Sequence, residues 1–139
     1  MKQSFIHKLT VFSTLMLLAC APAHADDETP LSKEMDELSS ALKSLRKAEG
    51  WEAKAEIARK AQEYCLAGLK YLPRQFKEMP EGKEKAKATA DYKRLTADAY
   101  SAICQLEIAF LNEDEDAVDE ALSLIKEVKK SGHKKYDDS

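Results

Sequence analysis

Apolar residues spaced alternately four and three positions apart are the feature of this sequence that most constrains its fold. After Thr29-Pro30 they fall at Leu31, Met35, Leu38, Leu42 and Leu45. The same spacing recurs, with Gln62 as a polar member, at Trp51, Ala55, Ala58, Gln62, Cys65, Leu69 and Leu72. Because an α-helix turns once in 3.6 residues, this spacing gathers the side chains on one narrow face. The pattern predicts two amphipathic helices, the first ended by Gly50 and the second by Pro73.

Two more helices are predicted in the second half of the chain. The stretch 84–111 carries one apolar strip at Tyr92, Leu95, Ala99, Ile103, Leu106 and Phe110, flanked by a second strip at Ala97, Tyr100, Cys104, Ile108 and Leu111. A wide buried face is therefore expected on this helix. The stretch 117–136 is expected to turn Val118, Ala121, Leu122, Ile125 and Val128 inward. In the longer connection 73–83, Phe76 and Met79 are expected to fold back over the end of the core.

The composition favours an all-α single domain. The chain of 139 residues has only 4 Gly and 4 Pro, too few turn-forming residues for a many-stranded β fold, and it is rich in the helix formers alanine, leucine, lysine and glutamate. Four helices joined mostly by short turns predict an up-down-up-down antiparallel four-helix bundle. In that topology the start of the first helix and the end of the last helix lie at the same end of the bundle.

The N-terminal segment has the pattern of a signal peptide. Lys2 and Lys8 accompany an apolar run at 9–19 that is too short to span a bilayer. Ala23-His24-Ala25 follows as a small-residue cleavage site. Residues 1–25 are therefore expected to be removed on export.

The mature domain, residues 26–139, is expected in a bacterial periplasm. A competing interpretation is that Cys20, after Leu17-Leu18-Ala19, is lipidated and anchors the protein to a membrane. Cleavage after Ala25 removes two lysines and no acidic residue from a chain of formal net charge −3. The acidic domain has no basic stripe, which argues against nucleic acid as a partner.

Two side chains that can ligate iron are predicted to meet at one end of the bundle. Met35 lies about 6 Å from the start of its helix at 1.5 Å per residue, and His133, the only histidine beyond residue 25, lies at a similar depth in the last helix. On a helical wheel His133 is about 20° from Leu122 and about 60° from Val118, so it is expected to point toward the core face. This requires the last helix to pass Gly132, which costs a helix interior about 1 kcal/mol and is a common helix end.

The two ends of the domain resemble a known family. The motif Leu31-x-x-x-Met35-x-x-Leu38-x-x-x-Leu42-Lys43, with the terminal His133-x-Lys135-Tyr136, is similar to the soluble periplasmic cytochrome b562 family of four-helix bundles. The resemblance implies one haem b per chain with Met35 and His133 as axial ligands of the iron. It further implies a cofactor site made of Leu31, Met35, Leu38, Tyr92, Ile125, Val128, Lys129, His133 and Tyr136, with Lys129 in place of a common arginine and Tyr136 closing the open edge. Because Lys129 and Gly132 occupy the cysteine positions of a Cys-x-x-Cys-His signature, the haem is expected to be held non-covalently.

The function that this resemblance implies is electron transfer, with transient contacts to redox partner proteins and a monomeric state. An enzyme is not expected, because the sequence has no acid–base pair, no Glu-x-x-His di-iron motif and no nucleophile with a base. The alternative is a haem-free exported bundle that acts as a binding or structural protein.

Cys65 and Cys104 are the cysteines of the mature domain. An oxidising compartment favours their pairing. Their positions within the predicted helices place them about 20 Å apart along the bundle axis, a distance that no disulfide spans. Buried free thiols are therefore expected.

Overall fold

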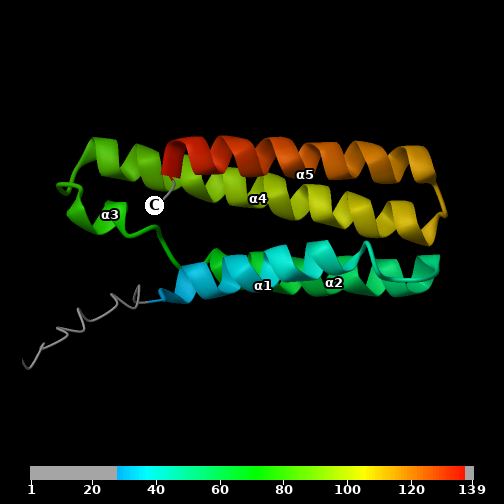
Figure 1. Ribbon diagram of the computed structural model, residues 1–139. Helices are drawn as coiled ribbons and strands as arrows, with labels where there is room; N and C mark the ends of the chain where they lie inside the picture. Colours follow the sequence, from blue (N-terminus) through cyan, green and yellow to red (C-terminus); the bar gives the residue numbers. More distant parts are fainter. Residues whose placement is uncertain (1–27, 137–139) are drawn as a thin grey trace, which may run out of the picture.

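A computed structural model of the chain describes residues 28–136, and every regular element in this range is a helix. The elements are α1 (Pro30–Ser44), α2 (Trp51–Gly68), α3 (Gln75–Glu78), α4 (Lys83–Leu111) and α5 (Glu115–Tyr136) (Figure 1). The prediction of an all-helical chain is confirmed for these residues. The signal peptide, the cleavage site and Cys20 lie outside the described residues.

The four long helices form two layers, α1 with α2 and α4 with α5 (Figure 1). Chain direction alternates from one long helix to the next, so that α1 begins and α5 ends at the same end of the molecule. Within residues 28–136 the extensive helix contacts join α1 to α2, α2 to α4 and α4 to α5, whereas α1 and α5 share no extensive interface. This packing is compatible with the predicted bundle.

The helix ends differ in detail from the prediction. Thr29 caps α1, because its Oγ1 accepts a hydrogen bond from the Ser32 backbone N–H at 3.0 Å and Pro30 occupies the first turn. Gly50 precedes α2 instead of ending α1, and its φ of 81° is a left-handed conformation that suits glycine. At the start of α5, Asp114 Oδ1 accepts from the Ala117 N–H at 3.0 Å.

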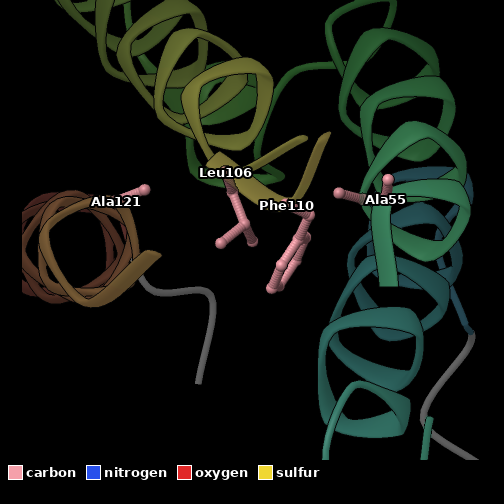
Figure 2. Packing of buried hydrophobic residues seen from close by; sticks show 5 residues of the cluster. Ala55, Leu106, Phe110 and Ala121 are labelled. Atoms are coloured by element: carbon pink, nitrogen blue, oxygen red, sulfur yellow. The ribbon is translucent and has the colours of Figure 1, made fainter. Parts of the chain in front are cut away.

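The core is made largely of alanine on α2 and α5 and of larger side chains on α4. One cluster contains Ala55, Ala58, Leu106, Phe110 and Ala121, and Figure 2 shows Leu106 and Phe110 of α4 in the space between Ala55 of α2 and Ala121 of α5. A second cluster contains Ala61, Cys65 and Ile103, with Leu38, Tyr100 and Ile125 packed against it. The small alanines allow α4 to approach both α2 and α5 closely.

Several apolar residues that were predicted to face inward lie at the surface, among them Ala97 of α4 and Leu72, which is 37% exposed and follows the end of α2. On α4, Ile108 and Leu111 are 57% and 56% exposed, so the second strip of that helix is not buried along its whole length. On α5, Leu122 is 39% exposed, whereas the other positions predicted to face inward are buried or half-buried: Val118, Ala121, Ile125 and Val128. A narrower face is sufficient on α5 because its extensive contacts are with α4.

Candidate functional site

The last helix runs through Gly132 without a break, since α5 extends to Tyr136. The requirement stated above, that the last helix continue past Gly132 to carry His133, is therefore met. A Cβ placed on Gly132 would meet no described atom within 4 Å, so the interior side of α5 is not tightly filled at this residue. Contacts of Lys135 and Tyr136 with α4, described below, offset the helix-weakening effect of the glycine.

His133 lies on an exposed flank of α5, as does Lys129 one turn before it. The predicted orientation toward the core is therefore wrong for the structure described here. The error has a definite cause: Leu122, one of the two reference positions on the helical wheel, is itself exposed. His133 nevertheless sits on the last turns of α5, at the end of the molecule where α1 begins.

Met35 is half-buried and packs over Gly68 of α2. A Cβ placed on Gly68 would lie 2.5 Å from Met35 Cε and 3.8 Å from Leu31 Cδ1. Leu31, at 8% exposure, belongs to the same α1–α2 contact. The absence of a side chain at Gly68 therefore makes the room in which the end of the Met35 side chain lies.

The two helical glycines give a matched test of this contact. Gly132→Ala is expected to raise the free energy of unfolding by about 0.5–1 kcal/mol, because alanine has less conformational freedom to lose and its methyl meets no described atom. Gly68→Ala is expected to give a smaller gain or a loss, because its methyl would overlap Met35 Cε. Urea unfolding followed by circular dichroism measures both. Equal gains in the two variants would contradict the packing of Met35 over Gly68.

Three aromatic rings from three helices gather at the same end of α5. Phe76 of α3 lies 5.9 Å from Tyr92 of α4 and 5.4 Å from Tyr136 of α5, and the two tyrosine rings are 5.6 Å apart, measured between centroids. Phe76 is 1% exposed, which confirms that the connection before α4 folds back over the core. Tyr92 and Tyr136, both predicted to border a cofactor, are thus brought together, with Phe76 as a third member.

Asp91 of α4 was not among the predicted site residues, yet it bonds to the end of α5. Its Oδ2 accepts from Tyr136 Oη at 2.7 Å and from Lys135 Nζ at 2.9 Å, and its Oδ1 accepts from Arg94 Nη2 at 2.9 Å. No sequence pattern joins residues so far apart, so single-sequence reasoning had no signal for this contact.

The electrostatics of this group follow from these bonds. The hydrogen bonds from Lys135, Tyr136 and Arg94 hold the pKa of Asp91 well below its usual range, and burial together with Asp91 raises the pKa of Tyr136 to about 12. The stabilisation by Asp91 is therefore present above the ordinary carboxyl pKa, about 4, and is lost as the pH falls below it.

The remaining residues of the predicted cofactor site are buried or half-buried. Leu38 and Ile125 pack against the second core cluster, and Val128 is half-buried on the inner side of α5. Ile125 also packs against the first core cluster, so the predicted site residues are spread along the molecule and not confined to one end. The structure places the two predicted ligands, Met35 and His133, on helices that share no extensive interface.

The cysteines are free thiols, and Cys65 is buried. The reason given from the sequence was wrong, because the two residues are not far apart along the axis. Cys65 Sγ donates to the Thr96 carbonyl oxygen at 3.6 Å, and burial raises its pKa to about 11, with a smaller contribution from neighbouring Cys104. The error came from aligning the start of α4 with the end of α2, whereas α4 extends well beyond it (Figure 1).

Other kinds of site find little support in the described part of the chain. No group of three or more His, Cys, Asp and Glu side chains within residues 28–136 could hold a metal ion. None of the helices in this range is long and apolar enough to cross a membrane. A surface hollow of about 400 Å³ at the first turns of α4 is lined by residues that include Lys85, Thr89 and Lys93, but by neither predicted ligand.

No family model, no curated protein and no solved structure matches this chain. The resemblance to the cytochrome b562 family therefore rests on the two end motifs and on the order of the helices.

Proposed function

We propose that this protein is a periplasmic electron carrier that binds one b-type haem non-covalently between α1 and α5. Met35 and His133 are the axial ligands, and the long helices close around the haem as an antiparallel four-helix bundle. The observation that carries the proposal is the continuity of α5 through Gly132, which keeps His133 on a helix that ends where α1 begins. The protein acts as a monomer that meets its redox partners transiently.

The donor chemistry fits a haem iron with one strong and one weak ligand. The imidazole of His133 is exposed on α5, and the Met35 thioether is half-buried on α1. Methionine has a flexible side chain, so its sulfur can leave the surface of Gly68 and turn toward α5. A bound haem supplies reversible exchange between Fe(III) and Fe(II), and a thioether ligand favours the reduced state.

The space around these donors also supports the proposal. A Cβ placed on Gly132 would have no described atom within 4 Å. Within the described residues, α1 and α5 share no extensive interface. Leu31 and half-buried Val128 provide apolar surface that excludes water from the iron. Lys129, one helical turn from His133, places a positive charge where an acidic edge of the cofactor would reach solvent.

A visible spectrum tests the proposal directly. The full chain, produced and exported in haem-replete cells, is expected to show a Soret band and, after reduction, sharp α and β bands at a stoichiometry of one haem per chain. If the purified protein has no Soret band and also fails to bind added haemin, the electron-carrier function is excluded.

A haem-free binding protein is the second candidate. The observation in its favour is that Ile108 and Leu111 on α4 are more than half exposed, as in a surface that contacts another protein. A helical circular dichroism spectrum without any haemin binding would support this second function.

A further inference from the structure

One carboxylate joins the last turn of α5 to α4. Asp91 Oδ2 accepts two hydrogen bonds from α5, one from Tyr136 Oη at 2.7 Å and one from Lys135 Nζ at 2.9 Å. Within α4, Asp91 accepts a hydrogen bond from Arg94, and Arg94 also donates one to Asp98 Oδ2 at 2.6 Å. The Asp91 side chain is 29% exposed, so these bonds are partly shielded from water.

The contact is more than a single surface ion pair, which would contribute little. The Tyr136 ring packs on Phe76 and Tyr92, so its hydroxyl is held in place when it donates to Asp91. The same hydroxyl lies 3.4 Å from the Ala88 carbonyl oxygen, one turn earlier on α4. Ring packing and hydrogen bonds therefore fix the last residue of α5 from two directions.

The position of this contact matters because of the residues just before it. Terminal turns of helices fray readily, and Gly132 weakens this one further. His133 lies between Gly132 and the residues that Asp91 holds. If the turn 132–136 unwinds, His133 leaves the helix.

We propose that Asp91 is a positioning residue: through Tyr136 and Lys135 it keeps α5 helical beyond Gly132 and so keeps His133, the stronger ligand of the proposed haem, on the helix. The proposal rests on the haem-binding function proposed above. It assigns to a residue on α4, outside the ligand motifs, control over how long the haem is retained.

Amide hydrogen exchange of the haem-free full chain tests the structural half of the proposal. Asp91→Asn is expected to speed exchange of residues 132–136 by about three- to tenfold, because the neutral amide oxygen accepts weaker hydrogen bonds from Lys135 and Tyr136 and forms no ion pair with Lys135. Asp98→Asn is the matched control: it removes a carboxylate that bonds Arg94 but not α5, and is expected to leave this exchange unchanged. Equal exchange in Asp91→Asn and wild type would overturn the proposal.

Haemin release tests the other half. Asp91→Asn is expected to release haemin several times faster than wild type or Asp98→Asn, with the ferric spectrum shifted toward a five-coordinate form. Asp91→Glu, which restores the charge, is expected to recover part of the retention. Faster exchange without faster release would refute a positioning role. If the wild type binds no haemin, the proposed function is refuted. The exchange data would then still decide whether Asp91 stabilises the helical turn 132–136.

Discussion

Replacing His133 with alanine is expected to abolish haem binding or weaken it by at least about 100-fold, whereas Met35→Ala retains a five-coordinate haem. The imidazole is the stronger donor, so its loss removes the main bond to the iron, while loss of the weakly donating thioether leaves one axial position open. Haemin titration followed by the Soret band measures the affinities. The positions of the ferrous bands report the number of axial ligands.

Two controls keep this result specific. Lys134→Ala removes an exposed neighbour of His133 on the same helical turn, and Met79→Ala removes a half-buried methionine that lies outside α1. Both are expected to bind haemin as the wild type does. Because His133 is exposed, His133→Ala should retain its helical circular dichroism, so a loss of binding cannot be attributed to unfolding. Unchanged spectra in both ligand variants would refute the assignment.

The positions of the helices were predictable because each depends on local information. The four-three spacing of apolar residues and the residues that begin and end helices lie within a few positions of one another. α3 was missed because four residues around Phe76 are too short to show a period. The inward face of α5 was misjudged at Leu122, because leucine is typical of core positions. The packing of α5 on α4 leaves Leu122 facing outward.

The candidate site was predictable only to the level of helix ends. Alternating chain direction is enough to bring the start of α1 and the end of α5 to one end of the molecule, as Figure 1 shows. Side-chain contacts between helices are set by packing, for which one sequence carries no local signal. Met35 over Gly68 and Asp91 against Tyr136 both belong to this class. The axial distance between Cys65 and Cys104 was misjudged for the same reason. It depends on how far α4 extends beyond the end of α2, and this is set by the path of the connection between the two helices, which has no local sequence signal.

Leu106→Ala is expected to lower the free energy of unfolding by about 2–5 kcal/mol, a large part of the stability of a domain this size. Leu106 is 0% exposed and its neighbours in the first core cluster include Ala55 and Ala121, whose methyl groups cannot extend to fill the cavity. Leu122→Ala, at a position 39% exposed, is expected to cost less than about 1 kcal/mol. Urea unfolding of the haem-free protein gives both values. Similar losses in the two variants would mean that α5 packs on α4 through Leu122, and would contradict the orientation of α5 on which the placement of His133 depends.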